Sequence, residues 1–588
     1  MKKVLLVVLV AVGVLSILAF MLLAGFGLLF AMAEPGVGSR VILEVNLERG
    51  VIEQVPDDPL ARVMLEGVLE VGDLVDALEK AAGDRRVKAL VARVGSGGMG
   101  LSHLQEVRNA VLAFRESGKP AIAYAETFGE FGPGNGGYYL ATAFDEIYLQ
   151  PSGDLGLTGV IYESMFLKKT LEKIGVEPRM DRRHEYKNAT NQYTETEYTE
   201  PHREAMERIA ESQFEQIVQG ISAERSMTDD EVRALIDRGP FLGPEALEAG
   251  LVDGLAYRDE VYAKVQERAG QRARPLYIDT YLKRAGGPNT RGTTIALVHG
   301  FGSVARGSST YGPLDGSVVM GADTVAGALR SAIDDSRVKA IVFRVDSPGG
   351  SYSASDTIWR ETIRAREADK PLIVSMGNLA GSGGYYVAMD AEKIVAQPGT
   401  ITASIGVFGG KMLTAEMWGK LGITWDDVHT SRNSRFWSSF HDYDRRGQER
   451  FQAGLDRIYD DFTSKVAAGR DLPLEQVQRI ARGRIWTGAD AKELGLVDEL
   501  GGYDVALRLA REAIGLDADA PIRVKRFPAR RGTFEMLFGQ RPDRSAHSLL
   551  PALARTVRSL QPWVRTLKQL APVQDTGSLS MPPVGAGP

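Results

Sequence analysis

The amino-acid sequence repeats itself once over most of its length. FGPGNGGYYLATAFD (131–145) returns as NLAGSGGYYVAMD (378–390), and RRVKALVARVGSGG (85–98) returns as SRVKAIVFRVDSPGG (336–350). Further matched segments keep the two copies in register at an offset of about 245 to 251 residues. Two long copies indicate the duplication of a whole domain rather than a solenoid of short units.

Each copy alternates short β-rich runs with helical patterns. In the second copy, VKAIVFRV and LIVSM are predicted strands, and residues 353–368 between them have helical periodicity; in the first copy residues 101–117 hold the equivalent place. Strand, helix and strand in series predict an α/β fold with a parallel sheet. The polar, glycine-containing segment 285–293 is the predicted linker between two domains at 40–284 and 294–525.

The N-terminus is predicted to cross a membrane once. Residues 4–31 carry no charge and exceed the roughly 20 residues of a bilayer-spanning helix. Lys2 and Lys3 precede them, so the positive-inside rule places residues 1–3 in the cytoplasm and the rest of the chain outside. The alternative is a cleaved signal peptide, because residues 31–33 (AMA) resemble a cleavage site. The apolar region of such a peptide is only about 7–15 residues long, which favours an uncleaved anchor.

The C-terminal extension, residues 526–588, lies outside the repeat. Residues 545–571 carry leucine and valine at helical spacing, with basic residues between them. They predict an amphipathic helix that packs on its own domain or a neighbouring subunit, or lies on a membrane surface. Pro551 and Pro562 would interrupt this helix. The last 15 or so residues are predicted to be disordered.

Composition excludes several kinds of chemistry. There is no cysteine, so disulfides, thiolate metal sites and cysteine nucleophiles are absent. A net charge of −6 without a basic recognition motif argues against a nucleic-acid partner. The seven histidines form no HExxH, metal-ligand or Ser-His-Asp pattern, so we interpret each as a scattered surface residue and expect no metal and no cofactor. The glycine-rich stretches 94–100 and 300–307 lack the Lys-Ser/Thr of a phosphate loop.

Ser382 is the first candidate for chemistry. It stands in the stretch GSGGYY, just before a predicted buried helix, whereas the first copy has Asn135 at that place. A hydroxyl at such a strand-to-helix turn lies near the positive end of the helix, which suits a nucleophile. An N-cap would use the same residue type for helix initiation alone, and this stretch by itself favours neither interpretation.

A second feature follows a predicted strand of the same copy. In DSPGG (346–350), the pair Gly349-Gly350 could present N–H groups to an oxyanion. A tight turn is the alternative, since turns favour this composition. The first copy has GSGG (95–98) there, without the aspartate and the proline.

A serine nucleophile also needs a base, and lysine is the common choice where no histidine is suitable. Lys187, in HEYKNAT (184–190), lies 52 residues after Asn135, and the same spacing from Ser382 gives Ser434. The lysine and the serine therefore occur in different copies. On its position alone, Lys187 would be an ordinary solvated lysine.

Together, DSPGG, GSGGYY, PGTITASIGVFG (398–409) and the GLVD near the end of each copy resemble serine peptidases of family S49 in their long, two-repeat form. The resemblance covers about residues 40 to 515. It implies tandem domains with a fold related to Clp proteases and crotonases. It also implies a Ser/Lys site composed of Ser382 as nucleophile, Lys187 as general base, Ser404 orienting Lys187, and oxyanion donors from Gly349 or Gly350 and from Gly383. The first copy has Leu157 in the place of Ser404, consistent with an unused site.

The resemblance further implies a membrane-anchored serine endopeptidase that hydrolyses peptides, such as cleaved signal peptides, through an acyl-enzyme. Its expected location is the outer, periplasmic side of a bacterial inner membrane. Because serine and lysine lie on different copies, the site must form where a first copy meets a second, within one chain or between two. A closed homo-oligomer, such as a tetramer, is expected. The alternatives are an inactive membrane-anchored scaffold of the same fold and an acyl-CoA-processing relative of the crotonases.

Overall fold

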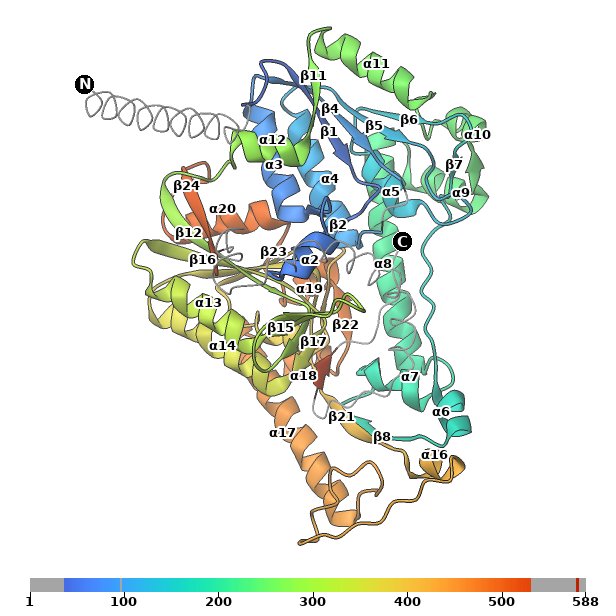
Figure 1. Ribbon diagram of the computed structural model, residues 1–588, viewed down its shortest axis with the longest axis vertical. Helices are drawn as coiled ribbons and strands as arrows, with labels where there is room; N and C mark the ends of the chain where they lie inside the picture. Colours follow the sequence, from blue (N-terminus) through green and yellow to red (C-terminus); the bar gives the residue numbers. More distant parts are fainter. Residues whose placement is uncertain (1–35, 96–97, 530–577, 581–588) are drawn as a thin grey trace, which may run out of the picture.

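The computed structural model describes residues 36–95, 98–529 and 578–580, and it contains one large, mainly parallel sheet in each copy (Figure 1). The first sheet runs in the order β10 (Gly254–Leu255), β6 (Glu146–Leu149), β5 (Ala121–Ala125), β4 (Val87–Arg93), β1 (Val41–Asn46) and β11 (Arg274–Tyr277). The second runs in the order β22 (Ile485–Thr487), β20 (Ile401–Ala403), β18 (Leu372–Gly381), β16 (Val338–Ser347), β12 (Thr293–Phe301) and β24 (Ile522–Phe527). Beside β18 lie β19 (Lys393–Ala396) and then β23 (Glu499–Leu500). Within these two sheets, all described pairings are parallel except β20 with β22.

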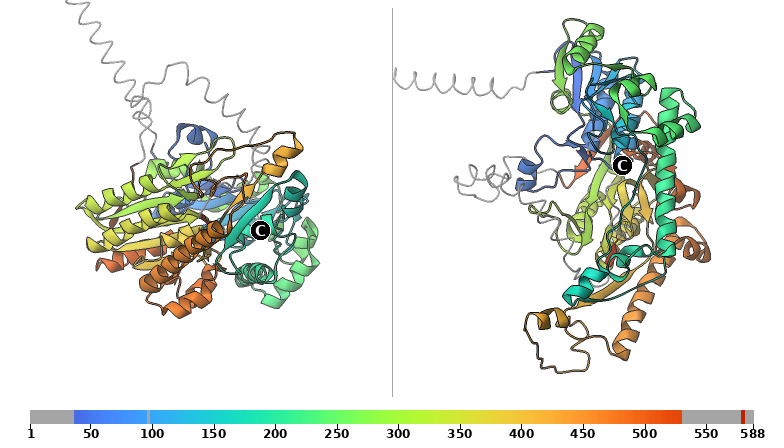
Figure 2. Two further views of the ribbon diagram at one scale, coloured as in Figure 1. Left: turned by 90° about the horizontal axis from the view of Figure 1, so that it is seen from below. Right: turned by 90° about the vertical axis from the view of Figure 1, so that its right-hand side faces the viewer.

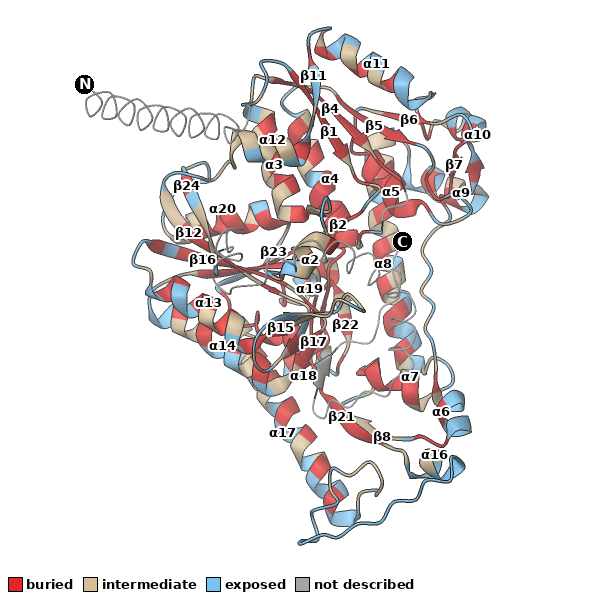
Figure 3. Ribbon diagram, in the orientation of Figure 1, coloured by how far each residue is buried: buried red, intermediate tan, exposed pale blue. Residues whose placement is uncertain are grey.

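Helices cover both faces of each sheet, which explains why the strands read as nearly continuous apolar runs. In β16, Phe343 and Val345 face one core while Ala340 and Val342 face the other. The covering helices in the first copy are α3 (Val71–Gly83), α4 (Leu101–Arg115) and α12 (Ile278–Ala285) on one face and α11 (Arg258–Ala269) on the other. In the second copy they are α13 (Ala322–Asp334), α14 (Tyr352–Glu367) and α17 (Arg445–Arg470) on one face and α20 (Tyr503–Ala513) on the other. The predicted α/β architecture is confirmed, and the burial is visible in Figure 3.

The same series of elements occurs twice. The helices α3 and α13 have 13 residues each, and α8 (Glu200–Arg225) and α17 have 26 each. The helices predicted at 101–117 and 353–368 are α4 and α14. The predicted linker corresponds to the segment between the end of α12 at Ala285 and the start of β12 at Thr293.

The first copy reaches across the second along one side. Its strand β8 (Glu177–Arg182) pairs antiparallel with β21 (Phe408–Leu413) of the second copy. Its long helix α8 then runs back beside the second copy, as Figures 1 and 2 show, and the Ser212 hydroxyl on α8 contacts that of Thr487 at 2.9 Å. The loop between β8 and α8 therefore lies over the second domain.

The buried helix expected after Ser382 is confirmed as α15 (Gly383–Tyr386), which is one turn long. One local expectation is wrong. Within the tail predicted to be disordered, Ser578–Ser580 form β25, which pairs antiparallel with β17 (Gly349–Ser351). The predicted anchor at 4–31 and the predicted tail helix at 545–571 lie outside the described residues, and within the described part of the chain no helix has the length and apolarity to cross a membrane.

Candidate active site

The structure brings the lysine of the first copy to the serine of the second within one chain. Lys187 Nζ lies 2.7 Å from Ser382 Oγ, 2.9 Å from the Ser404 carbonyl oxygen and 3.0 Å from Ser404 Oγ. All three residues are fully buried, so the interpretation of Lys187 as a solvated lysine is wrong. Ser434, the counterpart of Lys187 in the repeat, is exposed on a loop.

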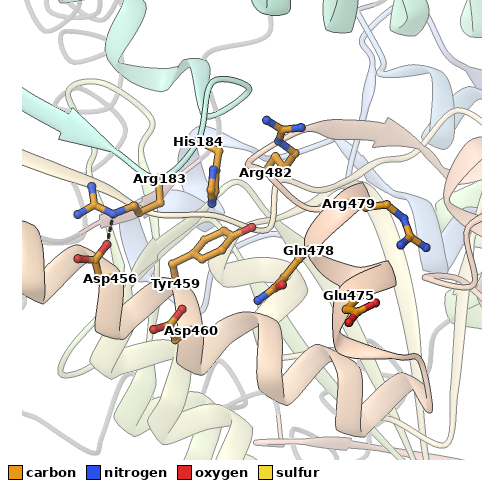
Figure 4. A pocket seen from close by; sticks show the side chains of 9 residues that line it. All are labelled: Arg183, His184, Asp456, Tyr459, Asp460, Glu475, Gln478, Arg479 and Arg482. Carbon is orange, nitrogen blue, oxygen red and sulfur yellow. Dashed lines mark hydrogen bonds and ion pairs between the residues drawn. The ribbon is translucent and has the colours of Figure 1, made fainter.

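The loop that carries Lys187 is fixed to the second copy by the residues before it. Arg183 donates to the backbone oxygen and the side-chain oxygen of Gln452 on α17, at 2.8 Å each, and forms an ion pair with Asp456. The His184 ring meets the Tyr459 ring edge-on at 4.6 Å. Figure 4 shows Arg183, His184, Asp456 and Tyr459 at a surface cavity of about 530 Å³ that contains none of the predicted site residues. The cavity therefore marks the joint that positions Lys187 rather than the place of chemistry.

Gly483, which the sequence analysis does not identify, leaves room for Lys187 beside Ser382 and Ser404. Gly483 has a φ of +80°, and a Cβ there would lie 2.5 Å from the Lys187 Cβ and 2.6 Å from its backbone nitrogen. Gly483 N–H also donates to the Ile405 carbonyl at 2.8 Å, next to Ser404. A single glycine before the strand β22 has no local pattern that would have revealed this role.

Ser382 stands on a strained turn between β18 and α15. Its φ of 55° and ψ of −112° are rare for a residue with a side chain and cost about 1–3 kcal/mol. The residue occupies the N-cap position of α15, but its side chain forms no capping hydrogen bond. The N-cap interpretation therefore does not explain the serine, whose hydroxyl faces Lys187 instead.

Ser404 is held in an equally unusual conformation. Ala403 and Ser404 have φ values of 63° and 53°, so three non-glycine residues with positive φ meet at this site. Ser382 N–H donates to the Ala403 carbonyl at 2.6 Å, and Ser404 N–H donates to the Arg484 carbonyl at 2.9 Å. These bonds hold the strained backbone and leave the Ser404 hydroxyl and carbonyl facing the Lys187 amine.

The environment of Lys187 disfavours its charged form. Burial lowers the pKa of the Lys187 ammonium well below its usual range. In the described part of the chain no carboxylate forms a hydrogen bond or ion pair with it to offset this effect. A neutral amine can donate to the two Ser404 oxygens and retain a lone pair toward Ser382 Oγ.

The predicted oxyanion glycines are not equivalent. Gly349 N–H already donates to Ser347 Oγ at 3.1 Å, which removes it as a free donor. Gly350 N lies beside Gly383, because a Cβ built on Gly383 would be 3.0 Å from it. The geometry therefore favours Gly350 and Gly383 over Gly349.

An extended segment of the chain lies along this glycine strand. β25 pairs with β17 in antiparallel register, with Gly349 opposite Ser580 and Gly350 opposite Leu579. The edge of β17 therefore accepts a peptide backbone in the extended conformation, next to the strained serine.

The equivalent place in the first copy is closed by its own hydrogen bonds. Asn135 is buried, its Oδ1 accepts from the backbone N–H groups of Thr158 and Gly159, and its Nδ2 donates to the Gly159 carbonyl at 2.8 Å. Leu157, in the place of Ser404, is fully buried. In the first copy, the amide of Asn135 thus occupies the place that corresponds to Ser382 in the second copy.

Comparison with known proteins shows the family. The sequence model of peptidase family S49 matches residues 113–272 and 364–517, one stretch in each copy and together more than half of the chain. The chain belongs to peptidase family S49. This membership makes it a serine protease, in agreement with the resemblance noted in its motifs.

Relatives of the S49 peptidase match most of its length. The chloroplastic serine protease SPPA of Arabidopsis thaliana is 29% identical and covers 93% of this chain and 77% of its own. Protease 4 of Salmonella typhi is 34% identical, with 75% and 71% covered. Protease 4 of Haemophilus influenzae is 31% identical, with 77% and 74% covered. A ClpP1 mutant structure from Listeria monocytogenes matches 36% of this chain with a TM-score of 0.23 and 15% identity, too low a similarity to bear on the fold.

The interpretation of the histidines as surface residues is wrong for two of them in the S49 peptidase. His103 and His202 are 3% and 4% exposed. His103 gathers with Glu53 and Asp346, so that one ligand-type atom of each lies within 4.8 Å of the others. These residues come from both copies and are distant in sequence, so no local motif announces the cluster.

The burial of Lys187 predicts a specific pH dependence of stability. The pKa of Lys187 is lower in the folded protein than in the unfolded chain, so folding releases a proton and the free energy of unfolding rises with pH between the two pKa values. Lys187→Met removes this dependence. The difference in melting temperature, K187M minus wild type, should therefore become more positive as the pH is lowered from about 9 to about 6.

Lys411 provides the comparison: burial lowers its pKa as well, but its amine donates to the Phe436 and His441 carbonyls at 3.0 and 2.6 Å and has no serine partner among the described residues. Lys411→Met should lower the melting temperature at every pH, since it leaves both carbonyls without their donor. Parallel pH profiles of wild type and K187M would contradict a neutral Lys187.

Proposed function

We propose that the chain is a membrane-anchored serine endopeptidase that acts like the long form of signal peptide peptidase A. In this proposal Ser382 is the nucleophile, Lys187 the general base, and Ser404 orients Lys187. The observation that carries it is the 2.7 Å contact between Lys187 Nζ and Ser382 Oγ, at a buried site where the amine is unpaired with any carboxylate of the described residues. Membership of a serine peptidase family supports the same roles.

The reaction follows from the proton positions. Neutral Lys187 takes the proton from Ser382 Oγ as it attacks the scissile carbonyl carbon. In this proposal the N–H groups of Gly350 and Gly383, which lie next to each other, stabilise the negative charge that develops on the carbonyl oxygen. The Lys187 ammonium then protonates the leaving amine, and water hydrolyses the ester to free the serine. Each step leaves the lysine ready for the next, so no cofactor is needed.

Ser404 has a separate role in this scheme. Its carbonyl and hydroxyl oxygens lie 2.9 and 3.0 Å from Lys187 Nζ and fix the direction of both amine hydrogens. With those hydrogens engaged, the lone pair points toward Ser382 Oγ. The strained φ of Ser404 is the backbone conformation that turns both oxygens toward one amine.

The substrate is proposed to be an extended peptide with small or apolar residues beside the cleaved bond, as in cleaved signal peptides and other membrane-derived fragments. The antiparallel pairing of β25 with β17 supports this mode, since it places an extended backbone along Gly349 and Gly350. Main-chain hydrogen bonds of this kind select for conformation rather than for a single side chain. A substrate would take the place of β25 on this edge.

Labelling with a serine-directed fluorophosphonate tests the proposed chemistry. The wild-type protein should be labelled at Ser382, because the probe needs the same activated hydroxyl as the peptide. Ser382→Ala should abolish labelling, and Lys187→Met should slow it by at least about 100-fold, because the hydroxyl loses its base. The readouts are the rate of labelling and the modified residue, identified by mass spectrometry.

Lys411→Met is the control, because it removes a second buried lysine outside the proposed site and should leave labelling unchanged. An unlabelled wild-type protein would favour the inactive scaffold. Labelling that does not depend on Lys187 would favour an active site unlike the proposed one, as in a crotonase relative that needs no lysine.

The protein is further proposed to be anchored in a bacterial inner membrane by residues 4–31, with the catalytic part on the periplasmic side. The charge-free run and the lysines before it support this orientation. Removing residues 1–31 should release the protein from carbonate-washed membranes. Recovery of the full chain in the soluble fraction would contradict the anchor.

We also propose that the chain assembles into a closed homo-oligomer, such as a tetramer. In the repeat register, β8 and β21 correspond to residues 424–429 and 161–166, which form no strand. Both segments expose large apolar side chains: Ile161, Met165, Trp425 and Val428 are 72%, 48%, 54% and 102% exposed. β8 and β21 pair within the chain, so their unpaired counterparts can pair with each other between chains.

This pairing is head-to-tail, and it gives a ring where the rotation between successive chains closes, as we propose here. Val428→Asp or Ile161→Asp should shift the protein to the monomer mass in light scattering, because either charge would be buried in the inter-chain strand pair. Leu247→Asp, at an exposed apolar residue outside both segments, is the control and should not change the mass. A monomeric wild-type protein would contradict the assembly.

A further inference from the structure

A buried cluster between the two copies is not used by the proposed chemistry. The side chains of Glu53, His103 and Asp346 are 8%, 4% and 16% exposed. His103 Nε2 lies 3.0 Å from a Glu53 oxygen and 3.7 Å from an Asp346 oxygen. Arg344 donates to both oxygens of Glu53 at 2.9 Å, so the glutamate remains charged. Arg344 and Asp346 of this cluster lie on β16, next to β18, the strand that ends before Ser382.

The proton positions in this cluster can be assigned from Asn378. The backbone N–H of His103 can only donate, and it meets Asn378 Oδ1 at 3.0 Å, which fixes the orientation of the amide. Asn378 Nδ2 therefore faces His103 Nδ1 at 2.7 Å and donates to it. The neutral ring then carries its hydrogen on Nε2 and donates it to Glu53. An Nε2 that carries a hydrogen has no lone pair for a metal ion, so the cluster fits a hydrogen-bond network better than a metal site.

Asn378 lies on an irregular part of the strand that ends at the nucleophile. Between β16 and β18 the register passes from Val345 opposite Met376 to Ser347 opposite Ala380, so one residue faces three. The extra N–H of this bulge, that of Leu379, donates to Asp346 Oδ1 at 2.9 Å. Ser382 follows the bulge directly at the end of the strand.

The first copy holds this bulge through the start of its helix α4. Ser102 Oγ donates to the Gly377 carbonyl at 2.9 Å, and Asn378 Oδ1 caps the helix by accepting from His103 N–H. Gly100, the N-cap residue of α4, has no side chain to serve as a cap, and a Cβ there would lie 2.4 Å from Asn378 Oδ1. The glycine-rich stretch 94–100, which is not a phosphate loop, thus leaves room for a side chain of the second copy.

We propose that His103 and Asn378 form a positioning pair that ties the nucleophile strand to the copy that supplies the base. This inference rests on the proposed function, in which Lys187 and Ser382 react although they belong to different domains. Lys187 belongs to the first copy and reaches the second on the loop after β8, whereas Ser382 extends from a bulged strand of the second copy. A link between α4 and that bulge limits how far the hydroxyl can move from the amine.

Substitutions at both ends of the pair test this role. Asn378→Leu removes both hydrogen bonds and should slow fluorophosphonate labelling of Ser382 and lower kcat on a peptide by about 10- to 100-fold. The KM should change little, because the residue does not face β17. His103→Asn retains an acceptor near the position of Nδ1 and should keep the labelling rate within about threefold of wild type.

Ser212→Ala is the matched control. It removes another buried hydrogen bond between the copies, to Thr487 at 2.9 Å on β22, which β20 separates from the nucleophile strand β18. It should lower the melting temperature and leave the labelling rate unchanged. If Asn378→Leu behaves like S212A, the pair is structural only and the proposal is wrong.

Asn378→Asp tests the pair through the pH dependence of labelling, which a purely structural role would not change. It also replaces Asn378→Leu if that variant does not fold. The carboxylate still caps α4 but must accept from Nδ1, so the pair forms only when His103 is protonated on both nitrogens. The charged groups that face His103 are Glu53 and Asp346, with Arg344 paired to Glu53. Burial opposes protonation, but both carboxylates raise the pKa of His103, and the added carboxylate would raise it further.

The labelling rate of N378D divided by that of wild type should therefore fall as pH rises, and the ratio cancels the titration of Lys187, which both proteins share. A ratio that is flat or rises with pH would overturn the pair while leaving Ser382 and Lys187 in place. If the wild-type protein is not labelled at Ser382 at all, the proposed function fails, and the positioning pair fails with it. Binding of added Zn²⁺ that is lost in H103N would overturn the proton assignment.

Discussion

The contact between a buried, uncompensated lysine and a serine on another domain is the constraint on which the rest of this structure depends. An ammonium group without a carboxylate is expensive to bury, so the fold must exclude water and hold the amine in its neutral form. The second domain supplies Ser404 and the strained turn around it, while the loop after β8 supplies the amine. Neither domain alone could make the site, which explains why the two copies interlock through β8, β21 and α8 rather than merely touch.

The two copies differ at the residues of the proposed site, as expected if each copy supplies only part of it. A duplicated domain begins with two identical sites, each needing a serine and a lysine. Here the first copy has Asn135 and Leu157 where the second has Ser382 and Ser404, and the second has the exposed Ser434 where the first has Lys187. Asn135 does not leave a void, because its amide is satisfied by the backbone of Thr158 and Gly159. The place equivalent to Ser382 is thus packed in the domain that supplies Lys187.

Much of this organisation could be predicted from the sequence, and the parts that could not share a physical cause. The alternating pattern predicts strands β16 and β18 and helices α4 and α14, because apolar periodicity is a local property. The motifs and the resemblance to family S49 point to Ser382 and Lys187, but the burial of Lys187 depends on Gly483, nearly 300 residues away in the chain. The preference for Gly350 over Gly349 depends on one hydrogen bond to Ser347. The sequence predicts His103 at the surface, whereas it is buried and in contact with Asn378 of the other copy, which no local pattern reveals.

A site divided between domains needs rigidity of a kind that a single-domain protease does not. If the copies moved by about 1 Å relative to each other, the lone pair of Lys187 would lose Ser382, at a cost of up to about 100-fold in rate. Packing of apolar faces resists separation but permits sliding, whereas hydrogen bonds with fixed direction resist both. The described interface has such bonds next to each group of the proposed dyad: Arg183 to Gln452 beside Lys187, and Ser102 and His103 to the bulge beside Ser382. Buried polar groups between the copies, which add little to stability, are therefore where the geometry of the site is fixed.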